Sequence, residues 1–534
     1  MDRTRENQQG RISRRQLLQG LGTAAAFVST PHILRVSQAH AQAGHGQTFA
    51  HGRDRFGRLF PQLAPFAAPS PPLEAALLEL GKSGGILDAN DPLEQGPILL
   101  ITDPAFSANN PNNPAHTAGT TFVGQFIDHD ITFDLTSRLG QPTRPERSPN
   151  ERTPALDLDS VYGGEPDDDP ELYQQEGPSA SGRRRHATKF KIESGGLFED
   201  LPRNSTGSAI IADPRNDEHL MIAGLQAAFL LFHNRAVDHV ASSHPRTPPG
   251  QVFKRARQLT TWHYQWMVLH EFLPLFIGQA LVDDILTNGR QFYTPQQAII
   301  PVEFQGAAYR FGHSMVRPSY RANLAGDNGQ PFFGLIFDPT QQGIADPADL
   351  RGGFRAPRRF VGWQTFFDFG DGNMRPNKRV DTRISTPLFQ LPLSAIATPG
   401  GPISLPQRNL LRHVTWQLPS GQRIAQHIGV PALSAADLQE LQGLGQHLNT
   451  STPLWYYILK EAEVMADGLH LGPVGGRIVG EVLIGLLQLD RRSFLSASPA
   501  WHPTLPTRNG QVTGDFRMVD FLTFAGVDPV SRGQ

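Results

Sequence analysis

The chain has 534 residues and no cysteine, and its 50 acidic and 48 basic side chains give a formal net charge of −2 at pH 7. This near-neutral balance supplies no basic field, which argues against nucleic acid as a partner. Without cysteine there is no disulfide framework and no thiolate to hold zinc, an iron–sulfur cluster or a thiolate-ligated heme. Any metal must therefore be held by histidine, carboxylate, carbonyl or water.

The N-terminus has the features of an export signal. Residues 13–18 (SRRQLL) resemble a twin-arginine signal, and a Leu/Gly/Ala/Phe stretch follows them. Residues 39–41 (AHA) have the small-x-small form of a cleavage site. We therefore expect residues 1–41 to be read by export machinery, and the mature protein to be periplasmic or secreted. No later segment offers about 18 uninterrupted apolar residues, so we expect no integral membrane segment in the mature chain.

Residues 42–120 are rich in Pro, Gly and Asn and predict an extended N-terminal arm packed on the remainder, with one short helix near residues 73–81. Residues 121–534 are expected to form one large domain. Few segments alternate apolar and polar residues, and long apolar stretches have helical spacing. The sequence therefore predicts a mainly α fold with long ordered loops and little strand.

Three long helices are expected in this domain. Asp213 as N-cap and Pro214 at the first helical position predict a buried helix that runs to about residue 240. A second long helix is predicted over 253–279. A third lies near residues 475–487, where Gly475, Gly476 and Gly480 would permit close helix approach.

The stretch 122–134 (FVGQFIDHDITFD) places three ionisable side chains between large apolar ones. Burying an unpaired charge is costly, so these groups must be hydrogen-bonded, neutral or bound to a metal. Adjacent side chains on a helix differ by about 100° in direction, so Asp128, His129 and Asp130 cannot all face one site. We expect the histidine to face one cavity and an aspartate to face another.

Oxygen-bearing side chains recur at Thr153, Asp157 and Asp159 in the segment TPALDLDSVYGG. In an extended chain alternate residues point the same way, so these side chains and the Ala155 carbonyl would converge. Calcium takes about 6–8 hard oxygen ligands, and one further carboxylate from elsewhere would suit such a site. A turn with solvated aspartates is the alternative interpretation.

Two further segments place polar groups among apolar ones. Arg215 and Glu218 lie in the first turn of the helix predicted from residue 213 and share a face at i and i+3, where an ordinary ion pair is the alternative. His313 follows Gly312, which would let a large group approach the backbone. A hydrogen-bonded core histidine is the alternative there.

In this order, the segments GQFIDHDITFD, LDLDSVYGG, DPRNDE…FHNR, YRFGH and NLLR resemble the successive signatures of the animal-type heme peroxidases. These form part of the peroxidase–cyclooxygenase superfamily, which includes myeloperoxidase, lactoperoxidase and bacterial relatives. The resemblance runs from about residue 55 to 525. It implies a single helical heme-peroxidase domain over 121–534, with a heme b-derived cofactor and Ca²⁺.

The resemblance also implies roles for individual residues. On the peroxide-facing side, His129 matches the catalytic base, Arg215 the distal arginine, and Gln125 a glutamine that orders water and substrate. Asp128 and Glu218 match two carboxylates that form ester links to heme methyl groups.

On the opposite side of the heme, His313 matches the proximal iron ligand and Asn409 the residue that accepts the other ring N–H of that histidine. Arg310 and Arg412 would pair with the heme propionates. The implied calcium ligands are Asp130, Thr153, the Ala155 carbonyl, Asp157 and Asp159. Calcium would then fix the backbone that aims His129 at the heme.

The implied function is a heme peroxidase that uses hydrogen peroxide to oxidise iodide, bromide, thiocyanate or phenolic donors through an oxoferryl intermediate. His219 stands where myeloperoxidase has a methionine bonded to the heme. That bond is associated with chloride oxidation, so we expect chloride not to be a substrate.

Three alternatives are open. One is a fatty-acid dioxygenase of the same superfamily, whose radical-forming tyrosine lies three residues before the proximal histidine. Arg310 stands there in this chain, and Tyr309, one residue away, is expected to be misdirected by about 100°. Another is a non-enzymatic adhesion module on a peroxidase scaffold. The third is a metallohydrolase with histidine and carboxylate ligands, although no clustered motif such as HExxH is present.

Overall fold

The computed structural model describes residues 54–532, apart from 176–186, 195–197, 354, 356–357 and 397–399. The export signal expected over 1–41 lies outside the described residues, as does the start of the N-terminal arm.

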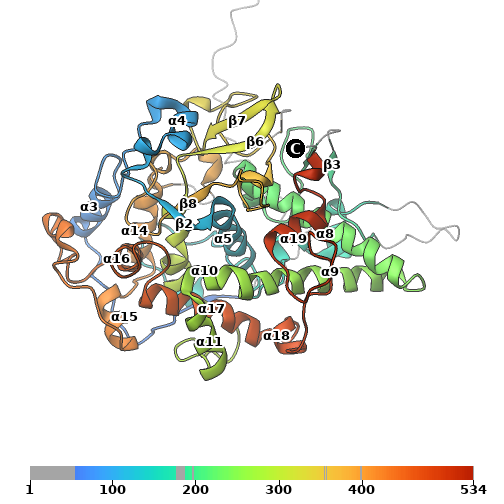
Figure 1. Cartoon of the computed structure of the whole chain (residues 1–534). Coiled ribbons are helices and arrows are strands. Elements are labelled where there is room, and N and C mark those ends of the chain that lie inside the picture. The colour runs from blue at the N-terminus through green and yellow to red at the C-terminus, as the bar shows by residue number, and fades with distance from the viewer. Residues whose placement is uncertain are drawn as a thin grey trace, which may run out of the picture. The chain divides into compact units, whose positions relative to one another are not determined.

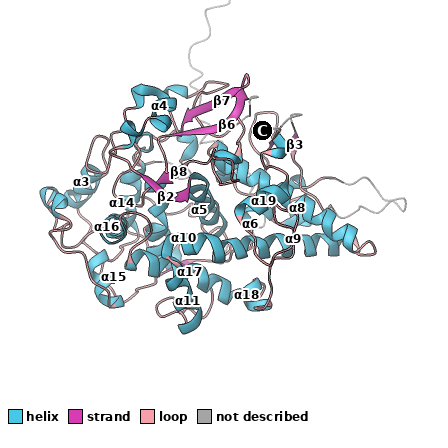
Figure 2. Cartoon of the chain, in the orientation of Figure 1, coloured by secondary structure: helices cyan, strands magenta, loops and turns pink. Residues whose placement is uncertain are grey.

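Helices dominate the described residues, as the sequence predicted, and the strands there form only two-stranded pairs (Figures 1 and 2). The α-helices are α3 (Pro71–Leu80), α4 (Gly96–Thr102), α5 (Ala118–Ile131), α6 (Asp159–Tyr162), α7 (Glu165–Asp168), α8 (Leu220–Ser243), α9 (Pro249–Met267), α10 (Leu273–Ile277), α11 (Gln279–Asn288), α12 (Val302–Gly306), α13 (Gly312–Met315), α14 (Leu405–Thr415), α15 (Gly421–Ile428), α16 (Leu454–Ala466), α17 (Pro473–Leu489), α18 (Phe494–Ala497) and α19 (Met518–Ala525). The paired strands are β1 (Phe56–Gly57) with β5 (Ile300–Pro301), β2 (Asn112–Thr117) with β8 (Pro376–Lys378), β3 (Glu193–Ser194) with β4 (Glu199–Asp200), and β6 (Ser319–Asp327) with β7 (Gln330–Leu335).

The N-terminal arm holds more regular structure than the sequence predicted. The short helix expected near residues 73–81 is α3, which begins after Ser70, whose side chain accepts a hydrogen bond from the backbone N–H of Leu73. The arm also contains α4 and the strand β2. Since β2 pairs antiparallel with β8, the end of the arm is hydrogen-bonded to a strand more than 250 residues later in the chain.

The helix predicted from residue 213 is two elements. Asp213 caps the chain as predicted, by accepting a hydrogen bond from the N–H of Arg215, but only a 3₁₀ turn follows, η5 (Pro214–Asp217). The backbone then becomes extended at His219, with φ of −154°, and α8 starts at the next residue. The apolar pattern starts only at Leu220, and the prediction of one continuous helix from residue 213 was wrong.

Helix α8 is long and apolar enough to cross a membrane by length and composition alone, but 89% of its most apolar window is buried inside the protein. Packing against α9, α19 and α5 accounts for this apolar sequence.

The helix predicted over 253–279 is largely present. It consists of α9, a π-helical turn at Val268–Phe272 and α10, and it ends at Gly278, which has φ of +78°. The glycines of α17 permit close helix approach, as predicted. A Cβ at Gly480 would lie 2.6 Å from the side chain of Ile277 on α10 and 2.8 Å from Ile285 on α11.

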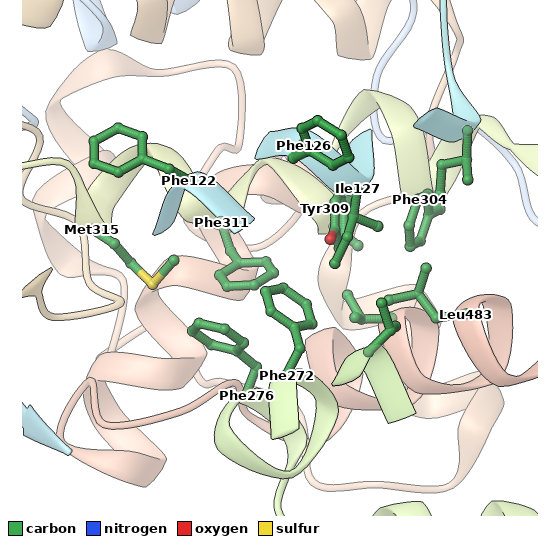
Figure 3. Close-up of a cluster of buried hydrophobic side chains, with 14 of the residues drawn as sticks. Phe122, Phe126, Ile127, Phe272, Phe276, Phe304, Tyr309, Phe311, Met315 and Leu483 are labelled. Carbon is green, nitrogen blue, oxygen red and sulfur yellow. The ribbon is translucent and has the colours of Figure 1, made fainter. Parts of the chain in front are cut away.

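Helix α5 lies in the centre of the described structure, in contact with α8, α13 and β8 (Figure 1). Its apolar residues Phe122, Phe126 and Ile127 are buried and belong to a cluster of hydrophobic side chains that includes Phe272 and Phe311 (Figure 3). Stacking of Phe126 on Phe229 of α8, at 4.3 Å between ring centroids, holds α5 against that helix. This packing fixes the helix on which the ionisable triplet lies.

Candidate active site

A cavity of about 220 Å³ opens between α5, the turn η5, the segment 305–316 and helix α14. Eight of the side chains that the resemblance assigned to a heme site line it: Gln125, Asp128, His129, Arg215, Glu218, Arg310, His313 and Arg412. The ninth, Asn409, lies behind one of them and hydrogen-bonds to His313. Four segments far apart in the sequence therefore meet at one cavity.

The ionisable triplet divides between two sites, as the helical geometry of α5 requires. Asp128 and His129 line the cavity. Asp130 is fully buried and lies among other carboxylates, where it accepts hydrogen bonds from the Leu158 N–H at 3.2 Å and the Ser160 hydroxyl at 3.1 Å.

His129 is held as a neutral imidazole. Its Nδ1 lies 2.8 Å from Oδ1 of Asn216, an oxygen that can only accept, so Nδ1 bears the proton. The Nε2 lone pair is therefore left available to the cavity. Burial, assisted by the positive charge of Arg215, lowers the pKa of His129 to about 4. Sequence reasoning missed Asn216, although it lies beside Arg215 in a motif that was noticed.

Arg215 is held in place by a buried carboxylate. Its Nε and Nη2 donate to the two oxygens of Asp213 at 3.0 and 2.7 Å, and Nη2 also donates to the backbone carbonyl of His129 at 2.9 Å. Asp213 simultaneously accepts from Nε and Nη2 of Arg152. Burial alone would raise the pKa of Asp213, but the guanidinium groups of Arg152 and Arg215 hold it well below its ordinary value.

Three side chains beside His129 form a hydrogen-bonded chain. His219 Nε2 lies 2.8 Å from Gln125 Oε1, and Gln125 Nε2 donates to Glu218 Oε2 at 3.2 Å. Burial raises the pKa of Glu218 to about 8, although Arg215 opposes the shift. Sequence reasoning did not predict the contact between His219 and Gln125.

On the other side of the cavity, His313 has the properties of a metal ligand. Burial and the charges of Arg310 and Arg412 lower its pKa to about 3, so the ring is neutral. Its Nδ1 lies 2.7 Å from Nδ2 of Asn409, while Oδ1 of the same amide is buried and has no hydrogen-bond partner among the described residues. Exchanging the amide oxygen and nitrogen of Asn409 gives both the amide oxygen and the His313 ring a hydrogen-bond partner. Oδ1 then accepts the Nδ1–H of His313, and Nε2 of the same ring is left free to bind a metal.

Positive charge gathers at one end of the cavity. Arg310, Arg408 and Arg412 all line it, and burial lowers the pKa of each of them, to about 9 for Arg310 and about 10 for Arg408. Arg412 Nε is buried with no partner among the described residues. Buried guanidinium groups favour an anion beside them. Arg408 was not predicted, since only the NLLR motif marked this helix.

Tyr309 corrects one expectation. It lines the cavity next to Arg310 instead of pointing away, and its buried hydroxyl has no hydrogen-bond partner among the described residues. The expectation assumed an α-helix, whereas residues 308–311 form a 3₁₀ turn, η7, in which consecutive side chains are spaced differently.

The second site is a cluster of carboxylates next to α5. One oxygen from each of Asp130, Asp157 and Asp159 lies within 4.8 Å of the others, and all three residues are buried. Burial and mutual repulsion raise the pKa of Asp130, and they raise that of Asp157 to about 7. Three buried carboxylates with raised pKa values are the donor set of a hard cation.

The predicted ligands converge by a different geometry from the one expected. The segment 153–158 is a turn and not an extended strand, and Leu158 adopts left-handed backbone angles, with φ of 61°, just before α6. Thr153 lies beside the cluster, where its N–H donates to Asp159 Oδ2 at 2.8 Å. Ala155 is buried within the same turn.

Comparison with known proteins agrees with this architecture. A family profile for the animal haem peroxidase domain matches residues 136–332, which include Arg215, Glu218 and His313. The chain is 24% identical to "Heme peroxidase 2" of Caenorhabditis elegans over 277 residues, which are 47% of this chain and 34% of that protein. The match thus spans about a third of the relative's length.

Solved structures share the fold at low identity. Peroxidase A of Dictyostelium discoideum aligns over 90% of this chain and 95% of its own, with a TM-score of 0.58 and 16% identity. A fatty acid alpha-dioxygenase of Oryza sativa aligns over 87% and 85%, with a TM-score of 0.50 and 14% identity.

The fold is therefore that of the helical heme peroxidases. Residues 136–332 match the animal haem peroxidase family, and the chain shares its fold with a peroxidase and a fatty acid alpha-dioxygenase of known structure.

Proposed function

We propose that this chain is an exported, calcium-containing heme peroxidase that uses hydrogen peroxide to oxidise small anions or phenolic donors. The observation that supports it most is the pair of neutral histidines, His129 and His313, which line one cavity from segments almost 200 residues apart. An asparagine amide lies against Nδ1 of each ring. Such a pair provides one imidazole to bind iron and a second to move protons.

The residues present fit a heme. His313, with Asn409 behind it, would hold the iron. Arg310 and Arg412 would pair with the propionates, which would also give the unpartnered Nε of Arg412 an acceptor. Asp128 and Glu218 line the same cavity and would be the candidates for ester links to the heme.

When bound, the heme would supply an iron that accepts peroxide and a macrocycle that stores oxidising equivalents. The protein's part is proton transfer and charge stabilisation. Nε2 of His129 would take the proton from one peroxide oxygen and return it to the other, which a neutral imidazole can do at neutral pH. Nη1 of Arg215 makes no hydrogen bond among the described residues, so it is available to the negative charge that develops as the O–O bond breaks.

Calcium in the carboxylate cluster would brace this apparatus. The cation would neutralise Asp130, which immediately follows His129 on α5. It would also act on Arg215 through a chain of buried ions, since Arg152 Nε lies 3.8 Å from Asp159 Oδ1 and Arg152 shares Asp213 with Arg215. Both groups that act on peroxide would then depend on one metal.

The proposed substrates are iodide, bromide, thiocyanate and phenolic donors, with chloride excluded. His219 stands at the position of the heme-linked methionine of myeloperoxidase, and its ring nitrogens are used in bonds within the protein. The twin-arginine signal over 1–41 supports export to the periplasm or beyond.

The test is the absorption spectrum of the protein reconstituted with heme, followed by stopped-flow mixing with peroxide. We expect a Soret band that shifts on mixing, and His129→Ala should slow that shift by about 10²–10⁴-fold, the range of a general acid–base catalyst, while heme remains bound. Unchanged kinetics in this variant would refute the role of His129.

A second candidate function is fatty-acid oxygenation, and Tyr309 is the observation that favours it. Tyr309 lines the cavity and its buried hydroxyl has no hydrogen-bond partner among the described residues, so it is the candidate to take a hydrogen atom from a substrate. Oxygen uptake with linoleate, abolished by Tyr309→Phe, would support a dioxygenase. No uptake, with phenol or iodide oxidised, would support the peroxidase.

A further inference from the structure

The hydrogen-bond partners of His219 determine which of its ring nitrogens carries the proton. The backbone N–H of Ile222, in the first turn of α8, donates to Nδ1 of His219 at 3.2 Å. Nδ1 therefore carries a lone pair, and Nε2 must bear the proton of the neutral ring. The neutral form is the one expected, because burial lowers the pKa of His219 to about 3. The start of α8 thus determines the tautomer of a side chain in the cavity.

The proton on Nε2 in turn orients Gln125. Nε2 of His219 lies 2.8 Å from the amide oxygen of Gln125, so that oxygen accepts, and the amide nitrogen is left to donate to Glu218 Oε2 at 3.2 Å. The reverse orientation would place the amide nitrogen against the Nε2–H of His219 and the amide oxygen against a carboxyl group. The contact with His219 would place donor against donor, so only one orientation is satisfied.

This orientation decides what the cavity offers to a ligand. An amide nitrogen has two hydrogens, and among the described residues Glu218 takes only one of them. Gln125 lines the cavity next to His129 and is partly exposed to it. The remaining N–H is a donor for a small anion. In the reverse orientation the amide oxygen, which can only accept, would face the anion.

We propose that His219 is a positioning residue that locks the amide of Gln125, so that the cavity presents an N–H donor to a small anionic substrate. This inference rests on the proposed peroxidase function. His219 would then set specificity without touching the substrate, and it would favour anions that accept a hydrogen bond, such as thiocyanate.

The variant that isolates this role is His219→Asn. Asparagine is among the best N-cap residues, so it can still accept the N–H at the start of α8. Its shorter side chain cannot also reach Gln125. His233→Asn is the matched control, because His233 is a buried histidine within α8, the helix that His219 caps. It is hydrogen-bonded to Tyr162 and the Thr188 carbonyl and is not part of the cavity lining.

The first measurement needs no heme. In protein labelled with ¹⁵N-histidine, the resonances that disappear in His219→Asn should show an unprotonated Nδ1 and a protonated Nε2. A ring protonated on Nδ1 would overturn the proposal, whether or not the chain is a peroxidase.

The second measurement uses the heme-loaded protein and thiocyanate. We expect His219→Asn to raise the KM for thiocyanate at least tenfold, while the rate constant for reaction with peroxide changes less than threefold. Gln125→Leu should raise the KM for thiocyanate to the same extent, and the double variant should have a KM no higher than either single variant, since both substitutions remove one interaction. Additive losses, or an unchanged KM in His219→Asn, would overturn the proposal.

The control variant separates a local effect from a loss of folding. His233→Asn should leave the KM for thiocyanate within twofold of the parent value. An equal rise in both variants would assign the effect to general destabilisation and would contradict the role of His219. Failure to bind heme would refute the proposed function, while the tautomer measurement would still decide the geometry.

Discussion

Replacing Asp213 with alanine tests the buried ion chain that holds the distal arginine. Asp213 is fully buried and accepts four charge-assisted hydrogen bonds, two from Arg152 and two from Arg215, at 2.7–3.0 Å. Breaking one buried ion pair by removing a partner costs about 3–5 kcal/mol, because the remaining charge is left uncompensated. Asp213→Ala leaves two such charges, so we expect the free energy of unfolding to fall by at least about 3 kcal/mol.

The assay is equilibrium unfolding in urea at 25 °C. A second variant, Asp213→Asn, separates the loss of the buried charge from the loss of the N-cap hydrogen bond. Asparagine caps helices well but carries no charge, so this variant isolates the electrostatic part. The pKa of Asp213 is depressed in the folded state, so its stabilisation is fully present above the ordinary value of 3.8 and is lost only as the pH falls through the lower folded value. The difference between parent and variant should therefore be constant from pH 5 to pH 8. A loss below 1 kcal/mol, or one that varies across that range, would refute this reasoning.

Other consequences of the structure can be tested more briefly. Asn216→Ala removes the acceptor that fixes the tautomer of His129, so it should slow the reaction with peroxide about 10–100-fold. Asn216→Asp still provides an acceptor and should retain most of the rate. Equal rates in the two variants would contradict the assigned tautomer of His129. Removing calcium with a chelator should lower the melting temperature, and calcium but not magnesium should restore it, because calcium accepts irregular coordination by the oxygens of Asp130, Asp157 and Asp159, whereas magnesium requires near-ideal octahedral geometry. Chlorination of monochlorodimedone at neutral pH should be undetectable while iodide is oxidised, and measurable chlorination would show that the myeloperoxidase-type methionine link is not needed.

The fold class and the division of the triplet could be predicted because they depend on local rules. A 100° step per residue requires Asp130 to leave the face occupied by His129, and in the structure it does. The N-cap at Asp213 follows from its side-chain chemistry and the proline after it. Such features need only a few consecutive residues.

The remaining features depend on contacts between distant segments. Asn216 and His219 matter through partners on α5, more than 80 residues earlier, and no spacing in the sequence records that they meet. The break in the helix at His219 is stabilised by the ring itself, which the apolar pattern does not register. The turn that brings the carboxylates together depends on a left-handed backbone at Leu158. This conformation is unusual for a bulky residue such as leucine, so the sequence did not predict the turn.

The central claim is that His313 binds the iron of a heme held between it and His129. The direct test is the absorption spectrum of purified protein titrated with heme, for the parent and for His313→Ala, with imidazole added to the variant. We predict one heme per chain with a Soret band typical of histidine-ligated ferric heme, lost in the variant and restored by imidazole. A parent protein that takes up no heme, or a variant with the same spectrum as the parent, would contradict the account.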